Sequence, residues 1–417
     1  MIPNSTTFDY ISEFDKWSMD NQHLCVIPYS NLGVHVGKKR RDPCCWYKSD
    51  QSDNPIAEVK KNIESGKIDK NCQLCYTQEA NNQFSGRQQA LAQLNPSDLP
   101  KFLTTKKIDT FLMFVTFSNK CNMACRICNG STSSLYDSIW NNNKNEPKSI
   151  SDDPTYFEII KSDIREAIDR YTFFKLIIMG GEGTVQSDLY MMTNWLQEEN
   201  LSYKIDLQIG TNGSVFLEET FNSWCNNFKS LSFAISVDST DEDNFVYVRY
   251  PVKFEKIHNN LQKFKLLTET HSNVEFDIRP TFYINNIAYL KEFLDYFEKF
   301  TILNRNIRIF NNTLSQCDHL SLLALPLYLR KKLSEQIQEI LSQEYSLFIQ
   351  NPVFKKSIHS FLDQLTSNNF SETNWATYMS TTARWDKLTN TNLSVNNKKF
   401  WDLLCEEDKN SYYRHIK

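Results

Sequence analysis

The fold is decided by one stretch, FLMFVTFSNKCNMACRIC, which occupies residues 111–128. Its first seven residues form a mainly apolar run of strand length. Its last eight residues read Cys121-Asn-Met-Ala-Cys125-Arg-Ile-Cys128, which places three thiols close enough in sequence to converge on one centre. The stretch therefore predicts a buried strand that ends in a metal-binding loop.

Five further apolar runs follow this one, and stretches with helical spacing separate them. The predicted strands are 111–117, 174–179, 205–209, 231–237, 274–278 and 307–310, and the predicted helices are 157–168, 189–196, 216–224, 257–264 and 287–294. A helix between two consecutive strands forces them to pair in parallel. We therefore expect an α/β fold, either an open doubly wound sheet or a barrel of parallel strands, with ligands at the carboxyl ends of the strands.

The pattern divides the chain into three parts. Residues 1–105 contain few periodic helical stretches and five cysteines, and we expect a small cysteine-rich module that is held together by metal. Residues 106–320 form the series of strands and helices. Residues 321–417 are predicted to be a mainly helical extension, although the stretch 375–401 is aromatic and polar and shows no clear period.

Composition narrows the class of protein. The 417 residues are 40% hydrophobic and 23% charged, which is typical of a globular chain, and a net charge of -4 gives no whole-molecule attraction to nucleic acid or to an anionic membrane. Residues 1–17 lack a secretion signal, and no apolar run is long enough to cross a bilayer. We expect a cytoplasmic protein, in which clustered cysteines among the eleven are metal ligands rather than disulfides.

The three-cysteine loop leaves two chemical interpretations. Thiolates are ligands for zinc, copper(I) or iron-sulfur clusters, and the loop supplies only three of the four ligands that a closed zinc site requires. A zinc knuckle completed by a distant cysteine is one interpretation. The other is a four-iron cluster held by three cysteines, which leaves one iron open to a small-molecule ligand.

The spacing Cys-x3-Cys-x2-Cys, after a strand and before a helix capped around residues 131–134, resembles the signature of the radical S-adenosylmethionine (SAM) superfamily. The resemblance implies a partial (β/α)6 TIM-like barrel and a [4Fe-4S] cluster on Cys121, Cys125 and Cys128. The turn 179–183 is similar to the family's glycine-glycine-glutamate turn, although Gly183 stands where the family usually has proline. The positions that match the family's cofactor-contacting segments are Ile127, Gly180, Gly181, Glu182, Thr211, Asn212, Ser236, Asp238 and Arg249.

A second set of cysteines lies in the first hundred residues: Cys25, Cys44, Cys45, Cys72 and Cys75. Four of these thiols would close a site, and thiolate ligation suits either a structural zinc or a fully ligated [4Fe-4S] cluster. The phrases around them, together with Glu79 and residues 85–87, resemble a radical SAM branch with a twitch-type auxiliary-cluster module, and a weaker match reaches residues 383–386. This resemblance implies an auxiliary [4Fe-4S] cluster on Cys25, Cys44, Cys72 and Cys75, with Cys45 as the alternative to Cys44.

The resemblance implies an enzyme that reductively cleaves SAM to a 5'-deoxyadenosyl radical, which abstracts hydrogen from a substrate. It implies an external one-electron donor of the flavodoxin or ferredoxin type and, as the first substrate class, a peptide or protein side chain. A small metabolite such as a sugar or nucleoside is the alternative substrate. A non-catalytic zinc-binding protein and an iron-sulfur electron carrier are the alternative functions. The basic run 38–41 is interpreted as either a solvated turn or a site that steers acidic substrates, and Cys225, Cys317 and Cys405 as isolated buried thiols.

Overall fold

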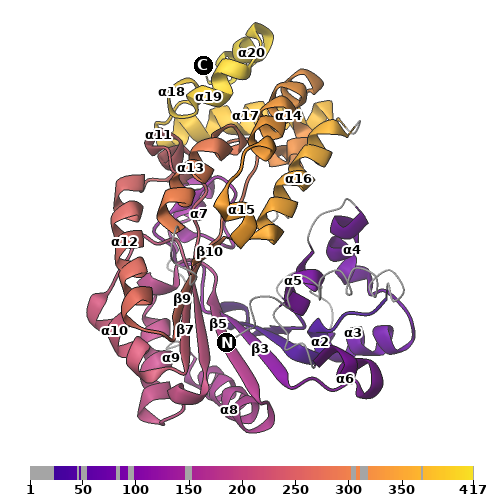
Figure 1. The fold of residues 1–417 in the computed structure, drawn as a ribbon, viewed down its shortest axis with the longest axis vertical. Helices are drawn as coiled ribbons and strands as arrows, with labels where there is room; N and C mark the ends of the chain where they lie inside the picture. The colour runs from indigo at the N-terminus through magenta and orange to yellow at the C-terminus, as the bar shows by residue number, and fades with distance from the viewer. Residues whose placement is uncertain are drawn as a thin grey trace.

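The computed structural model describes residues 23–44, 47, 54–80, 85–92, 98–145, 153–301, 307–309, 318–367 and 370–416. Within these residues the chain forms an eight-stranded sheet and a two-stranded ladder, with helices around them (Figure 1). Cys45, Cys317 and the end of the predicted strand 307–310 lie outside the described residues.

Six parallel strands form the body of the sheet. They are β3 (Thr110–Thr116), β5 (Phe173–Met179), β6 (Asp206–Thr211), β7 (Ser230–Ile235), β9 (Val274–Ile278) and β10 (Ile307–Ile309). Each strand pairs in parallel with the next one in the chain. The six predicted strands are therefore confirmed, and their sequential order with intervening helices is the arrangement of a partial (β/α)6 barrel.

The helices between these strands lie on one face of the sheet or at its carboxyl edge (Figure 1). They are α7 (Ser134–Asn141), α8 (Pro154–Arg170), α9 (Ser187–Glu198), α10 (Glu218–Asn227), α11 (Glu242–Val248), α12 (Phe254–Thr270) and α13 (Leu290–Thr301). Leu176, Leu207 and Leu231 are in register on three strands and are fully buried in one core with Ile160 and Leu196 of the helices. Because side chains alternate along a strand, the residues next to these leucines point to the opposite face, which we call the inner face.

The N-terminal part contributes two strands to the same sheet, which the sequence did not indicate. β1 (Asn31–His35) pairs in parallel with β3, and β2 (Arg40–Asp42) pairs antiparallel with β1. The helices of this part are α2 (Ile27–Ser30), α3 (Pro55–Glu64), α4 (Gln73–Ala80), α5 (Gly86–Ala92) and α6 (Asp98–Thr105). The cysteine-rich part is thus joined to the barrel by backbone hydrogen bonds at the β3 side.

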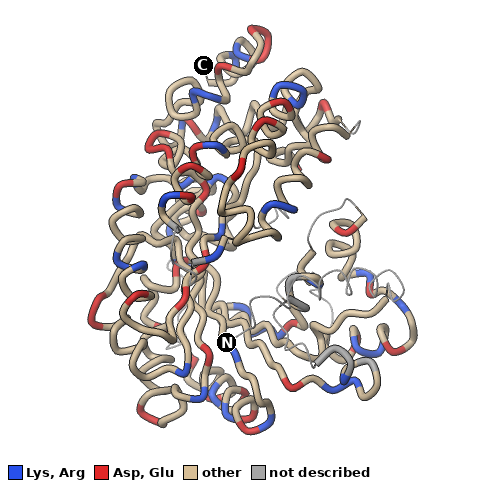
Figure 2. Tube along the Cα trace, in the orientation of Figure 1, with Lys and Arg blue, Asp and Glu red and all other residues tan. Residues whose placement is uncertain are grey.

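The basic run 38–41 lies in ion pairs. Arg41 lies 2.7 Å from Asp163, and Lys39 pairs with Asp153, so the run ties the β1–β2 hairpin to the start and middle of α8. Figure 2 shows acidic and basic residues interspersed over the described chain. These pairs favour the interpretation of the run as a solvated structural turn.

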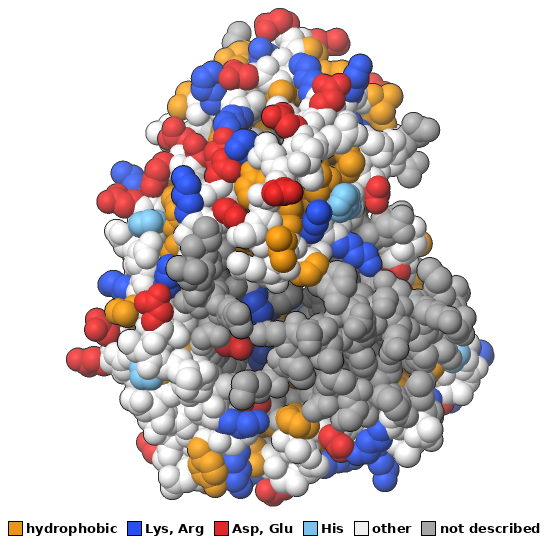
Figure 3. Space-filling model, viewed as in Figure 1, with side chains coloured by type: hydrophobic (Ala, Val, Ile, Leu, Met, Phe, Trp, Pro, Cys, Tyr) orange, Lys and Arg blue, Asp and Glu red, His pale blue; other side chains and the backbone are white. Residues whose placement is uncertain are grey.

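The C-terminal part is helical, as predicted. Its helices are α14 (Leu327–Ser342), α15 (Ser346–Gln350), α16 (Pro352–Thr366), α17 (Glu372–Thr389), α18 (Leu393–Asn396), α19 (Lys398–Leu403) and α20 (Glu406–Ile416). Hydrophobic side chains gather around α15 and α16 on the face shown in Figure 3, where Ile349 is exposed. The buried face of α17 includes Thr382, Asp386 and Thr389, which explains why no hydrophobic period was visible there. Among the described helices, none combines the length and the apolar composition that a membrane crossing requires.

Candidate functional site

The three-cysteine loop lies between the carboxyl end of β3 and the start of α7. Two short strands hold its middle, since β4 (Ala124–Cys125) pairs antiparallel with β8 (Arg249–Tyr250). Ser133 caps α7 and donates a hydrogen bond from Oγ to the carbonyl of Met123 at 2.6 Å. The serine cap expected near residues 131–134 therefore also anchors the loop.

The three thiols of the loop interact with one another. Cys128 donates a hydrogen bond to Cys125, which lowers the pKa of Cys125 and raises that of Cys128 well above its ordinary value. Burial, followed by the negative charge of Cys125, raises the pKa of Cys121 to about 12. The structure thus brings the three predicted ligands into one site.

The turn Gly180-Gly181 packs directly against this loop. Both residues have positive φ angles, 81° and 54°, which favour glycine. A Cβ on Gly181 would lie 2.3 Å from the carbonyl oxygen of Lys120, and a Cβ on Gly180 would lie 2.3 Å from a methyl carbon of Thr116. The turn therefore brings bare backbone to the loop at a distance that side chains would prevent.

Glu182 joins the ends of two strands. Its carboxylate is fully buried and accepts hydrogen bonds from the Thr211 hydroxyl at 2.8 Å, the Asn212 amide at 2.5 Å and both the amide and hydroxyl of Thr184. Burial raises the pKa of Glu182, and the hydrogen bonds from Thr184, Asn212 and Thr211 oppose that rise. The side chain therefore fixes the glycine turn relative to the end of β6.

Asn212 continues this network to the cysteine loop. Its Nδ2 donates to Oδ1 of Asn122 at 2.8 Å and lies 4.0 Å from Sγ of Cys121. Asn122 in turn donates to the hydroxyl of Ser214 at 2.8 Å. The end of β6 is thus hydrogen-bonded to the residue that follows the first cysteine.

The end of β7 reaches the loop through a buried ion pair. Nε of Arg249 lies 2.8 Å from the carboxylate of Asp238, and its Nη1 lies 3.8 Å from Sγ of Cys125. The amide of Ser236 donates to the carbonyl of Thr211 at 2.9 Å, which links β7 to β6. Two of the remaining predicted contacts, Asp238 and Arg249, therefore lie beside the second cysteine.

Ile127 lies between the second and third cysteines. Its side chain is half-buried and packs against the main hydrophobic core. An aliphatic surface is therefore present at the position where the family resemblance implies an aromatic contact with adenine.

The N-terminal cysteines also form a group. Burial, followed by the charges of Cys75, Cys44 and Cys72, raises the pKa of Cys25 well above its ordinary value. Cys25, Cys44 and Cys72 pack against one small apolar cluster that includes Leu24. The structure thus brings together the four thiols that the sequence resemblance implies, while Cys45 lies outside the described residues.

A salt bridge supports this second group. Glu79 accepts hydrogen bonds from Nε of Arg87 at 3.0 Å and from the hydroxyl of Ser85 at 2.5 Å, and Arg87 also donates to the carbonyl of Leu24. Arg87 is buried. Burial raises the pKa of Cys75, and a hydrogen bond from the backbone of Arg87 opposes that rise. Glu79 and residues 85–87 therefore hold the segments on either side of the thiols in place.

The inner face of the sheet carries polar side chains that the sequence interpretation missed. Gln208 and Ser232 are buried and in register, and Oγ of Ser232 has no hydrogen-bond partner within the described part of the chain. Asp277 lies 2.8 Å from Nη2 of Arg279 and 2.8 Å from Nε of Arg308. The alternation of apolar and acidic residues in the strand sequence Val-Glu-Phe-Asp-Ile could have revealed this polar face.

Lys175 lies on the same face, nearer the amino ends of the strands, in register with Leu112 of β3 and Asp206 of β6. Burial lowers its pKa to about 8, and the positive charges of Arg308 and Arg279 also oppose its protonation. Within the described residues, Nζ has no ion pair with a carboxylate. The inner face therefore has charged groups from three strands.

The chemistry of the donors fits iron-sulfur clusters. Both groups supply thiolates, and the glycine turn beside the loop leaves bare backbone next to three sulfur ligands. Across the described ranges, no group of three or more His, Cys, Asp or Glu side chains is arranged to hold a single metal ion. Cys405 is exposed rather than buried, which corrects the prediction for that thiol, whereas Cys225 is buried as expected.

Part of this chain matches a known protein family, and two solved structures are similar to it at low sequence identity. The family model described as the Radical SAM superfamily matches residues 115–297. The solved structure of anSMEcpe with bound AdoMet is 19% identical, with a TM-score of 0.37, over 55% of this chain and 61% of that one. Streptococcus suis SuiB bound to S-adenosylmethionine is 18% identical, with a TM-score of 0.38, over 69% of this chain and 60% of that one. The chain thus spans about 60% of the length of these structures, and no curated protein matches it.

Proposed function

We propose that this chain, whose residues 115–297 match the model of the Radical SAM superfamily, uses a [4Fe-4S] cluster on Cys121, Cys125 and Cys128 to cleave SAM reductively. The observation that supports this proposal is the convergence of the three thiols on one site, against which the Gly180-Gly181 turn packs. Once bound there and reduced by an external one-electron donor, the cluster would supply the electron that converts SAM to methionine and a 5'-deoxyadenosyl radical, and that radical would take hydrogen from a substrate.

The surrounding residues hold and orient the cofactor in this proposal. The backbone of Gly180 and Gly181 would receive the amino group of SAM, because no side chain blocks its approach. Glu182 keeps that backbone in place through Thr211 and Asn212. Arg249 carries the positive charge that would meet the cofactor carboxylate, and Asp238 sets the direction of its guanidinium.

We further propose an auxiliary [4Fe-4S] cluster on Cys25, Cys44, Cys72 and Cys75. Its support is the mutual electrostatic interaction of these four thiols and the apolar cluster that packs on Cys25, Cys44 and Cys72. Four thiolates leave no open iron, so the site would hold or relay an electron rather than bind SAM.

The substrate that we propose is a peptide or protein side chain, which follows from the sequence resemblance to the auxiliary-cluster branch. The solved structures to which this chain is similar include SuiB bound to its precursor peptide SuiA and anSMEcpe bound to a peptide. The inner face offers Asp277, Arg279 and Lys175 as polar partners for a substrate inside the barrel. A sugar or nucleoside is the alternative substrate.

Anaerobic reconstitution tests the proposal. The purified chain should bind iron and sulfide and, with dithionite and SAM, should form 5'-deoxyadenosine. Cys125→Ala should abolish that product, whereas Cys225→Ala, which removes a buried thiol on α10 outside both groups, should retain it. A colourless protein that binds zinc and no iron would instead identify a zinc-stabilised binding protein.

A further inference from the structure

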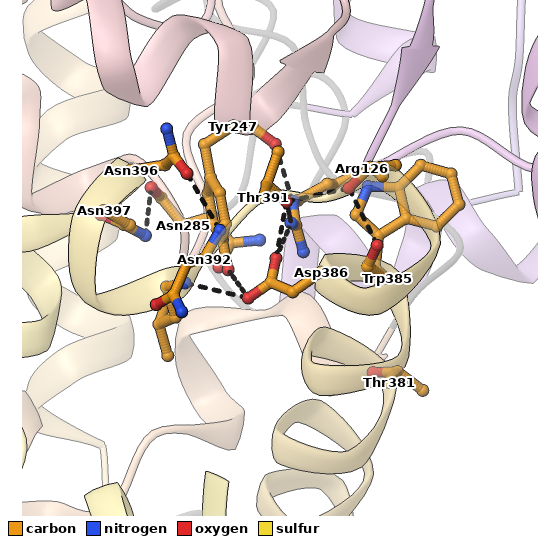
Figure 4. Close-up of polar contacts among 12 residues, drawn as sticks. Arg126, Tyr247, Asn285, Thr381, Trp385, Asp386, Thr391, Asn392, Asn396 and Asn397 are labelled. Carbon is orange, nitrogen blue, oxygen red and sulfur yellow. Dashed lines mark hydrogen bonds and ion pairs between the residues drawn. The ribbon is translucent and has the colours of Figure 1, made fainter. Parts of the chain in front are cut away.

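Three consecutive residues of α17 contact the cysteine loop and the helix that follows it. The guanidinium of Arg384 lies 4.0 Å from the ring centroid of Trp140, and the ring of Trp385 stacks on Tyr136 with centroids 4.7 Å apart. Asp386 forms a buried ion pair with Arg126, which lies between the second and third cysteines (Figure 4). The C-terminal helices therefore reach the part of the chain that carries the proposed cluster ligands.

Arg126 is held on several sides. Its Nε donates to the carbonyl of Tyr247 at 2.7 Å, and its guanidinium lies 3.6 Å from the ring centroid of that tyrosine. Nη2 also donates to the hydroxyl of Thr391 at 3.0 Å. Because the backbone amide of Arg126 donates to the carbonyl of Val248, both ends of this residue are fixed.

Asp386 provides the negative charge that pairs with Arg126, and several hydrogen bonds hold its carboxylate in place. It is 1% exposed and accepts hydrogen bonds from the Tyr412 hydroxyl at 2.7 Å, the Leu393 amide at 2.9 Å and the Thr391 hydroxyl at 2.9 Å. Figure 4 shows Asp386 pointing toward Arg126 and Tyr247 from the end of α17. The donors come from α20 and from the segment after α17, so the C-terminal fold holds the carboxylate in place.

We propose that Asp386 is a positioning residue for the proposed cluster: it fixes the loop through Arg126 and neutralises the arginine charge beside Cys125. This inference rests on the proposed function, because it assigns Asp386 to the surroundings of the same cluster. The C-terminal extension is then part of the cluster environment rather than an appended domain.

Removing one partner leaves the other as an uncompensated buried charge. A net positive charge near a cluster favours its reduced form and raises its reduction potential, and a net negative charge has the opposite effect. The direction in which the reduction potential shifts therefore distinguishes an electrostatic and positioning role from a loss of folding alone.

The test compares Asp386→Asn, Arg126→Met and the double variant in the reconstituted full chain. The reduction potential is measured by EPR for the cluster whose signal changes when SAM is added, and 5'-deoxyadenosine formation is measured in parallel. We expect Asp386→Asn to shift the potential upward, Arg126→Met to shift it downward and the double variant to return near the wild-type value. All three should form 5'-deoxyadenosine roughly tenfold more slowly or worse, because the loop loses its anchor.

Arg330→Met is the matched control. Arg330 is another buried arginine of the C-terminal helices, and it donates to the carbonyls of Leu325 and Ser367 at 2.8 and 2.9 Å. Its replacement should lower thermal stability without moving the potential. Single variants that behave like this control, or that shift the potential in the same direction, would overturn the inference. A wild-type protein without a SAM-responsive cluster would instead refute the proposed function itself.

Discussion

The carboxylate of Asp238 lies 2.8 Å from Nε of Arg249, and both side chains are buried beside Cys125. Asp238 also accepts a hydrogen bond from the amide of Thr281 at 2.8 Å. One ion pair therefore connects the end of β7, the segment after β9 and the cysteine loop.

Arg249→Met should destabilise the protein by about 3–5 kcal/mol, because Asp238 would remain as a buried charge without its partner. Urea unfolding measures the change. The double variant Arg249→Met/Asp238→Asn should recover part of the loss. A cost below about 1 kcal/mol for the single variant would show that the pair does not stabilise this region.

Gly181→Ala should reduce 5'-deoxyadenosine formation by about 100-fold, because the new Cβ would displace the carbonyl of Lys120 next to the first cysteine. Gly66→Ala is the control: Gly66 also has a positive φ, 72°, but a Cβ there would meet no atom within 4 Å. Both variants carry backbone strain of about 1–3 kcal/mol, and only Gly181→Ala should lose the product. Equal activities would contradict this explanation of the turn.

Lys175→Met should stabilise the protein at neutral pH. Burial depresses the pKa of Lys175 from 10.5 to about 8. Below pH 8 the folded state therefore contains a charged amine that burial destabilises. Between pH 8 and 10.5 the unfolded state binds more protons, and wild-type stability rises with pH. The variant should therefore be more stable by up to about 3 kcal/mol at pH 7, with the difference disappearing above pH 10.5.

Urea unfolding of both proteins at pH 7, 9 and 10.5 measures this difference. Lys229→Met is the control, since Lys229 immediately precedes β7, pairs with Asp206 at 2.9 Å and is partly exposed. A stability difference for Lys175→Met that did not change with pH would rule out the charge as its cause.

Cys72→Ala should reduce the iron content from about eight to about four atoms per chain, because it removes one ligand of the proposed auxiliary cluster. Iron and sulfide analysis after reconstitution measures the loss. SAM cleavage should persist in this variant, whereas peptide modification should fail. Unchanged iron content would mean that the four N-terminal thiols hold no cluster.

The six barrel strands were predictable because each is a short run in which apolar residues are continuous, as in β3, or alternate with polar ones, as in β9. β1 and β2 were not, since they have five and three residues, and β1 pairs with the distant strand β3 while β2 pairs with β1. The periodicity of α17 was hidden because its buried face carries two threonines, Thr382 and Thr389, and Asp386, which pairs with the distant Arg126. The thiol groups were found from spacing, but the pairing of Arg126 with Asp386, 260 positions away, has no local signal.

The parallel pairing of β1 with β3 fixes the distance between the residue pairs at the two ends of β1. Leu112 is in register with Asn31 and Thr116 with His35, so these levels are about 13 Å apart along the strands. The backbone of Cys44 lies close to Gly33, which pairs with Phe114 midway between these two levels, whereas Cys121 follows Thr116 in the chain. The segment that carries Cys44 and the strand that leads into the three-cysteine loop are therefore joined through hydrogen-bonded strands of one sheet, so the two thiol groups belong to one continuous structural unit.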